Sequence, residues 1–157
     1  MPPLPRVVVE IDPKEWERCC VEAGLTGPQT IRFRRFPPKS QRIHGRPVYG
    51  EAQKTPPCIY IYLCIEQYDH ARFRDVHNEL IDTILHELRH LYQFKTWPQE
   101  KWISEVGTPY EAKPSEIDAE RWAKKNRSEY KRIAKIRRVY RSNLGRIDAA
   151  QARVLGS

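Results

Sequence analysis

Residues 76–91 read VHNELIDTILHELRHL, and this stretch fixes how the rest of the chain is interpreted. Its apolar residues recur at intervals of three and four, the spacing that lines one buried face of a helix: Val76, Leu80, Ile84, Leu88 and Leu91. We therefore predict a helix over residues 71–94, with this stripe packed on a hydrophobic core.

The same stretch contains an HExxH pattern, from His86 through Glu87 to His90. Residues four apart on a helix share a face, so both imidazoles can reach one metal ion. Glu87 can project beside that ion, where a carboxylate can take a proton from a water molecule. The pattern predicts a metal centre on a half-buried helix, with the two histidines at the edge of the apolar stripe.

Three short apolar runs predict β-strands, at residues 6–11, 30–36 and 58–65. The last run alternates aliphatic side chains with tyrosine and cysteine, which is typical of a strand with one face on a core. We predict an α+β fold in which a small mixed sheet packs on the motif helix, as a single domain over residues 1–145. Residues 146–157 are expected to form a weakly ordered tail.

Two more helices are predicted, separated by loops. An Asp-Pro start and a glycine stop bound the first helix, over residues 14–23. Residues 37–57 are rich in Pro, Gly, Gln and Lys and predict an irregular or hairpin loop, and residues 95–113 predict a long connecting loop. The last helix is predicted to begin at Pro114 and to run to about Tyr140.

A catalytic zinc ion takes three protein ligands and keeps one position open, so a third donor must come from outside the motif. Residues 116–123 read EIDAERWA and begin the last predicted helix. Glu116 can complete the ligand set, and the small Ala119 allows close packing of the two helices. Glu120 lies one turn later and can accept a proton from a ligand histidine. Asp118 is less favoured as a ligand, because it points about 200° around the helix from Glu116.

HExxH at residues 86–90 followed by ExxAExxA at residues 116–123 resembles the gluzincin metallopeptidases, and most of all the small minigluzincins. The resemblance covers about residues 58–123. It implies a zincin-like fold, in which an edge strand above the motif helix receives an extended peptide. It also implies one zinc ion with the ligands His86, His90 and Glu116.

The resemblance further implies a reaction. Glu87 would act first as general base and then as general acid, in a zinc metallopeptidase that hydrolyses peptide or protein substrates. A second electrophile usually helps to hold the oxyanion in such reactions. Tyr110, just before the last predicted helix, is the first candidate for this role, and Tyr130 is the second.

A third histidine ligand would instead indicate SprT-like proteases or metzincins. No histidine follows His90, which excludes the HExxHxxGxxH form. His77 precedes His86 by nine residues, about 13 Å along a helix axis, so the two cannot share an ion.

Positive charge gathers near the C-terminal end. Residues 121–157 hold 12 Lys and Arg but only two acidic residues, whereas residues 1–120 hold 16 Lys and Arg and 18 acidic residues. The basic helix predicted over residues 121–141 is either a solvated face or a patch for non-specific nucleic acid or an acidic partner. The alternative function is therefore a basic nucleic-acid- or protein-binding module with a structural or inactive metal site.

The remaining composition bears on the compartment. No run of about 20 apolar residues predicts a membrane span, and the N-terminus lacks the pattern of a secretory signal. The cysteines form no CxxC pair, which is typical of free thiols in a reducing compartment: Cys19, Cys20, Cys58 and Cys64. We expect a cytoplasmic protein without membrane association.

Overall fold

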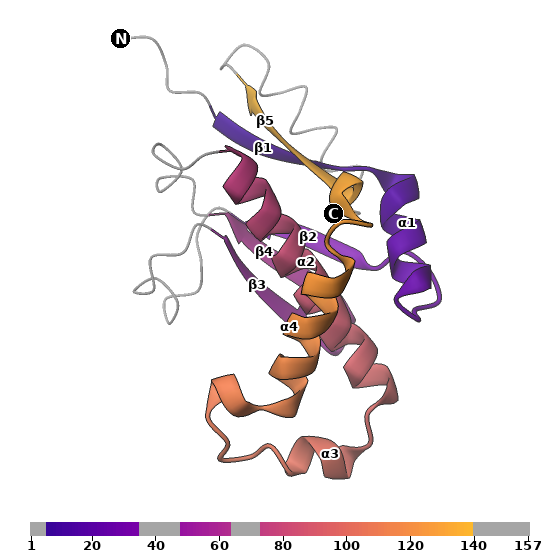
Figure 1. The fold of residues 1–157 in the computed structure, drawn as a ribbon. Helices are drawn as coiled ribbons and strands as arrows, with labels where there is room; N and C mark the ends of the chain where they lie inside the picture. Colours follow the sequence, from indigo (N-terminus) through magenta and orange to yellow (C-terminus); the bar gives the residue numbers. More distant parts are fainter. Residues whose placement is uncertain (1–5, 35–47, 64–72, 140–157) are drawn as a thin grey trace.

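The computed structural model describes residues 6–34, 48–63 and 73–139, and it has a mixed α+β fold (Figure 1). The strands are β1 (Arg6–Ile11), β2 (Thr30–Arg34), β3 (Val48–Gln53), β4 (Cys58–Leu63) and β5 (Ala134–Val139). The α-helices are α1 (Pro13–Glu22), α2 (Phe73–Thr96), α3 (Gln99–Ile103) and α4 (Pro114–Asn126). Two 3₁₀ turns, η3 (Tyr110–Ala112) and η4 (Lys131–Ile133), flank α4.

The described strands form two small sheets. One has the order β2-β4-β3, with β2 parallel and β3 antiparallel to β4. The other is an antiparallel pair of β1 and β5. Within the described part of the chain, β3 is therefore an edge strand, as β2 is on the opposite side.

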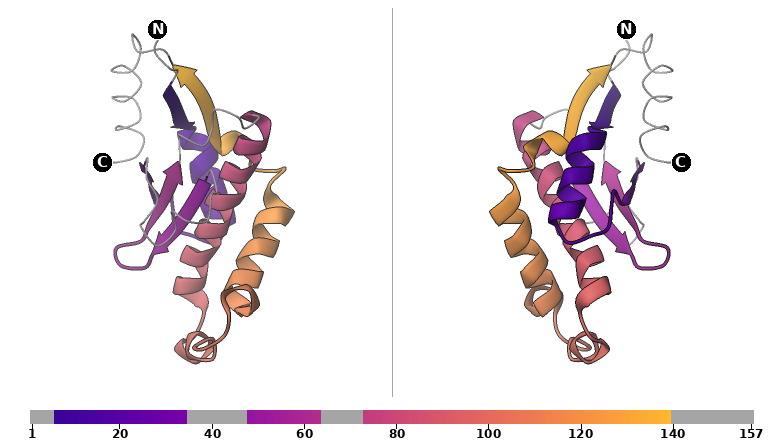
Figure 2. Two further views of the ribbon diagram at one scale, coloured as in Figure 1. Left: turned by 90° about the vertical axis from the view of Figure 1, so that its left-hand side faces the viewer. Right: turned by 90° about the vertical axis from the view of Figure 1, so that its right-hand side faces the viewer.

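Helix α2 is the central element of the fold. It packs against β3 and β4 on one side and against α4 on another, so that it lies between the three-stranded sheet and α4 (Figures 1 and 2). The predicted apolar stripe is confirmed, because every one of its members is at most 4% exposed: Val76, Leu80, Ile84, Leu88 and Leu91. Ala119 on α4 is fully buried, as its predicted packing role requires.

Other local predictions are also confirmed. Strand β4 buries Ile59, Ile61 and Leu63 and leaves its tyrosines half-buried, which is the expected alternation. Helix α1 begins where predicted, since an oxygen of Asp12 accepts a hydrogen bond of 3.0 Å from the backbone of Glu15.

The prediction of an irregular or hairpin loop over residues 37–57 is confirmed in part, because β3 forms a hairpin with β4, and the prediction of a long connecting loop over residues 95–113 is wrong in part. The first segment contains β3, whose pairing with β4 depends on residues outside its own short and partly polar sequence. The second contains α3 and η3, two short elements with no apolar periodicity to reveal them. The consequence for the site is that an edge strand lies beside the motif helix.

The long basic helix is the larger error. Helix α4 ends at Asn126, and the chain then turns and enters β5, which pairs along its length with β1. Ile133 and Ile136 fit a helical stripe as well as they fit a turn and a strand, so the local pattern was ambiguous. The basic residues are divided between two elements, and several are paired: Lys124 with Glu120, Arg127 with Asp82 and Arg137 with Glu10. The continuous basic helix that supported the nucleic-acid alternative is therefore not formed.

Some predictions fall outside the described residues, among them the tail at residues 146–157 and the thiol of Cys64. Cys19, Cys20 and Cys58 are free, as predicted, and the structure buries all three. No helix in the described ranges has the length and apolar character needed to cross a membrane.

Candidate metal centre

Three side chains from α2 and α4 converge at one point. His86 and His90 lie one turn apart on α2, and Glu116 comes from the first turn of α4, which starts at Pro114. His86 Nε2 lies 2.8 Å from Glu116 Oε2, and His90 Nε2 lies 3.1 Å from Glu116 Oε1. The two Nε2 atoms are 3.1 Å apart. The structure thus brings together the three residues that the sequence predicted as ligands.

This arrangement fits a zinc ion. Tetrahedral zinc with bonds of about 2.0–2.2 Å holds its donors about 3.3 Å apart, close to the 2.8–3.1 Å separations observed. Two imidazole nitrogens and a carboxylate are also a donor set that zinc accepts at catalytic sites. Within the described residues, the group formed by His86, His90 and Glu116 is the one cluster able to hold a metal ion.

The electrostatics of the cluster show how strongly its charges depend on one another. Burial disfavours the charged form of His90, but the hydrogen bond to Glu116 and the nearby charges of Glu87 and Glu116 outweigh it and raise the pKa of His90 to about 9. Burial acts against the Glu116 carboxylate as well. Hydrogen bonds from His86, His90 and Tyr110 nevertheless hold the pKa of Glu116 well below its usual range. A dication can replace the protons that hold this cluster together.

Glu87 has a different environment. Its side chain is 7% exposed, and burial raises the pKa of its carboxyl, although the histidine charges act in the opposite direction. It packs against Gly50 of β3, where an added Cβ would lie 2.6 Å from Glu87 Cγ and 2.7 Å from Thr83 Cγ2. The absence of a side chain at position 50 is therefore what gives Glu87 its room beside the candidate metal ligands.

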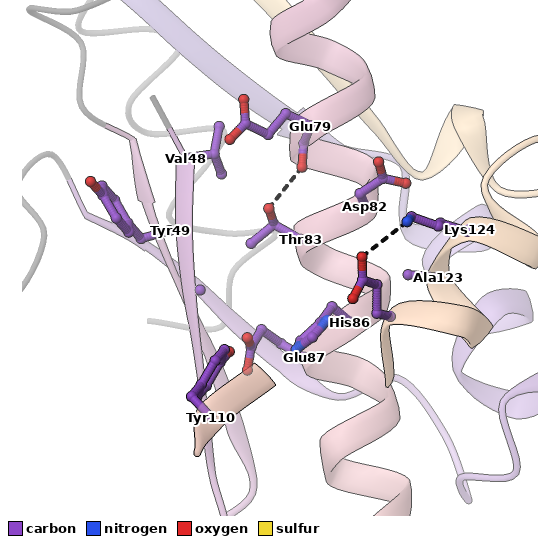
Figure 3. A pocket seen from close by; sticks show the side chains of 12 residues that line it. Val48, Tyr49, Glu79, Asp82, Thr83, His86, Glu87, Tyr110, Ala123 and Lys124 are labelled. Carbon is purple, nitrogen blue, oxygen red and sulfur yellow. Dashed lines mark hydrogen bonds and ion pairs between the residues drawn. The ribbon is translucent and has the colours of Figure 1, made fainter. Parts of the chain in front are cut away.

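Two cavities meet at Glu87. The larger, of about 470 Å³, follows the N-terminal part of α2 and is lined by His86, Asp82 and other polar groups (Figure 3). The smaller, of about 390 Å³, continues past His90 toward Phe94 and Trp102. Glu87, Gly50 and Tyr110 line both cavities. A chain lying along this groove would therefore pass Glu87 at its middle.

The two candidate tyrosines lie in different places. Tyr110 is 63% exposed on η3, and Figure 3 shows its hydroxyl end directed toward Glu87. Tyr130 is buried in the hydrophobic core, and its hydroxyl donates a hydrogen bond of 2.5 Å to Glu22. Tyr130 as an oxyanion donor is therefore wrong, whereas Tyr110 stays a prediction.

The partner of His90 is a residue that the sequence reasoning missed. His90 Nδ1 lies 2.8 Å from Gln93 Oε1, and Gln93 is fully buried. Asp118 is not in the donor cluster but bonds Arg89 and Gln93. Glu120 forms an exposed ion pair of 2.9 Å with Lys124. Because His90 Nδ1 already has Gln93 as its partner, the predicted role of Glu120 as an acceptor for a ligand histidine now concerns His86, and it stays a prediction. The signal in the sequence was a polar residue three positions after His90, and it did not by itself identify the partner of that ring.

No family model matches this chain, and no curated protein or solved structure matches it either. What the protein does is therefore inferred from its own residues.

Proposed function

We propose that this protein is a zinc metallopeptidase of gluzincin type with a zincin-like fold. The observation that supports this most is the convergence of His86, His90 and Glu116 beside a buried glutamate in a groove next to edge strand β3. A metal site with a purely structural role takes four protein ligands, whereas this cluster offers three and adjoins two cavities.

Zinc bound by these three side chains would supply a Lewis acid that polarises a peptide carbonyl and favours deprotonation of a water. Glu87 takes one proton from that water while the oxygen of the water attacks the carbonyl carbon. The same carboxyl then delivers the proton to the amide nitrogen as the C–N bond breaks, so it returns to its ionised form. Burial raises the pKa of the Glu87 carboxyl, which makes its carboxylate a stronger base for the first transfer.

Edge strand β3 provides a place for the substrate backbone. Extended peptides are commonly recognised by adding a strand to an exposed sheet edge. A peptide bound along β3 would run from one cavity into the other. Its scissile carbonyl would then lie near Glu87 and the hydroxyl of Tyr110, where the two cavities meet. Tyr110 would then donate a hydrogen bond to the oxyanion.

The substitution Glu87→Gln tests this function. It keeps the size of the side chain but removes the base, so hydrolysis of an unstructured protein such as casein should fall by about 10²–10⁴-fold. Zinc content, measured by mass spectrometry, should stay at one ion per chain, and removal of zinc by a chelator should abolish activity in the unsubstituted protein. Equal rates of cleavage by the variant and the unsubstituted protein would show that the proposed function is wrong.

A further inference from the structure

Gln93 connects the two helices of the metal centre. Its side chain is fully buried, and each end of its amide has a partner within hydrogen-bond distance. Oε1 lies 2.8 Å from His90 Nδ1. Nε2 lies 2.9 Å from the backbone oxygen of Ser115 and 2.8 Å from Asp118 Oδ2. The amide thus joins a proposed ligand on α2 to Ser115 and Asp118, one residue before and two residues after Glu116 on α4.

The orientation of this amide is set by the chemistry of its neighbours. The carbonyl of Ser115 can only accept a hydrogen bond. The carboxylate of Asp118 is held ionised by Arg89, whose Nε and Nη2 lie 2.8 and 3.2 Å from its two oxygens, so it also accepts. Turning the Gln93 amide around would place its oxygen against two oxygens. Nε2 is therefore the donor to α4, and Oε1 is left as an acceptor.

An accepting Oε1 determines the tautomer of His90. The ring must donate through Nδ1, and in the neutral ring this leaves the lone pair on Nε2. Nε2 is the nitrogen that faces His86 and Glu116, at 3.1 Å from each. Gln93 therefore presents the metal-binding nitrogen of His90 at the point where the three donors meet.

The other end of the amide holds Glu116 in place. Helix α4 has no side-chain cap from its own N-cap residue. Glu105 supplies one instead, because its buried carboxylate accepts hydrogen bonds of 2.5 Å from Ser115 N and 2.8 Å from Ser115 Oγ. Together, Glu105 and Gln93 fix the first turn of α4, which carries Glu116, against α2.

We propose that Gln93 is a positioning residue of the metal centre: it selects the His90 nitrogen that binds the ion and fixes the register of Glu116 on α4. The inference rests on the proposed zinc site. It extends the functional pattern of α2 from five residues to eight, HExxHxxQ, over residues 86–93.

Two substitutions separate the two tasks of Gln93. Gln93→Met keeps the volume but removes all three hydrogen bonds of the amide. Gln93→Glu keeps an acceptor for His90 Nδ1 but loses the donor to Ser115 and Asp118. Zinc affinity, measured by competition with a chromophoric chelator, should fall about 10–100-fold in both variants, which is the usual effect of losing a group that orients a metal ligand.

Nitrogen NMR of the zinc-loaded protein then distinguishes positioning from a general loss of stability. The unsubstituted protein and Gln93→Glu should show a protonated Nδ1 on His90, and Gln93→Met should show a shifted or exchange-broadened Nδ1 signal. Ile81→Val is the matched control, because it trims a fully buried residue of the same helix away from the site and should leave affinity and signals unchanged. Unchanged zinc affinity together with an unchanged His90 signal in Gln93→Met overturns the inference. Absence of zinc binding in the unsubstituted protein would overturn the proposed function as well.

Discussion

Helix α2 packs against α4 on one side and against β3 on another, and each contact contains one glutamate of the site. The pKa values of these two glutamates, Glu116 and Glu87, are shifted in opposite directions. On the α4 side, hydrogen bonds from three side chains hold the pKa of Glu116 far below its usual range. On the β3 side, Glu87 packs against the bare backbone of Gly50, and burial raises its pKa. A metal ligand has to stay ionised, whereas a proton carrier has to accept a proton near neutral pH. The difference between the two contacts therefore fits the two tasks that we propose for these glutamates, Glu116 as a metal ligand and Glu87 as the proton carrier.

The largest effect is expected from removing a proposed metal ligand of α2 that faces α4. His90→Ala should lower zinc affinity by more than about 100-fold, beyond the loss caused by removing a group that only orients a ligand. Activity should disappear with the metal. The control is His77→Ala, on the same helix, whose ring bonds the backbone oxygen of Ala134 and not the site. Stoichiometric zinc retained by His90→Ala would show that the ligand assignment is wrong.

The metal-free protein should lose stability as the pH rises. The pKa of His90 is raised to about 9 in the folded state, so the charged ring stabilises the fold fully below about pH 6.5. This contribution is lost as the pH rises through about 9, and it amounts to about 3 kcal/mol. Urea unfolding of the metal-free protein at pH 6 and pH 9.5 would measure it.

Two controls isolate His90 in that experiment. Zinc-saturated protein should show little of the loss, because a ligand histidine is already neutral. The variant His90→Ala should show a smaller difference between the two pH values than the unsubstituted protein. Equal pH dependence in the variant would place the effect elsewhere.

The β3 side can be disturbed without touching a ligand. Gly50→Ala places a Cβ at 2.6 Å from Glu87 Cγ and 2.7 Å from Thr83 Cγ2, so Glu87, the proposed base, must shift. None of the three proposed ligands is among the atoms nearest to that Cβ. We expect hydrolysis to fall about 10–100-fold with zinc retained, since displacing a reacting group by about 1 Å costs about this much. Gly27→Ala makes the same change where nothing lies within 4 Å and should have no effect. Loss of zinc in Gly50→Ala would contradict the separation of the two sides.

Local patterns predicted the parts of the site that lie within one element. The helical period of α2 placed His86 and His90 on one face, and it required no knowledge of any other segment. Glu116 was predicted because it opens a second helix whose small Ala119 allows close packing, and because the resemblance implied it as a ligand. Gln93 could not be predicted in this way, because its role depends on where Ser115 and Asp118 lie on another helix.

Long-range pairing also explains the main error of the fold. Residues 134–139 become β5 because β1, at the other end of the described chain, needs a partner along its whole length. A helix over the same residues would leave the backbone groups of β1 without those hydrogen bonds. The local sequence, with basic residues scattered between two isoleucines, does not contain this information.

Tyr110 lies between the α4 side and the β3 side of the site. Its hydroxyl bonds Glu116, and its side chain lines both cavities together with Glu87. Tyr110→Phe should lower kcat and leave KM nearly unchanged, because an oxyanion donor acts mainly in the transition state. Tyr130→Phe is the matched control, since that hydroxyl bonds Glu22 in the core and its loss should change only stability. A rise in KM without a fall in kcat would make Tyr110 a substrate-binding residue instead.

The smallest effect is expected at Glu120, on the exposed side of α4. Its carboxylate pairs with Lys124, and both side chains are more than 60% exposed, so solvent screens their interaction. Glu120→Gln should therefore change zinc affinity by less than about threefold, in contrast to the 10–100-fold loss expected for a group that orients a ligand. The chelator competition used for Gln93 measures both variants on one scale. A loss at Glu120 as large as that at Gln93 would mean that His86 also has an orienting partner, and that both ligand histidines are held from outside the motif.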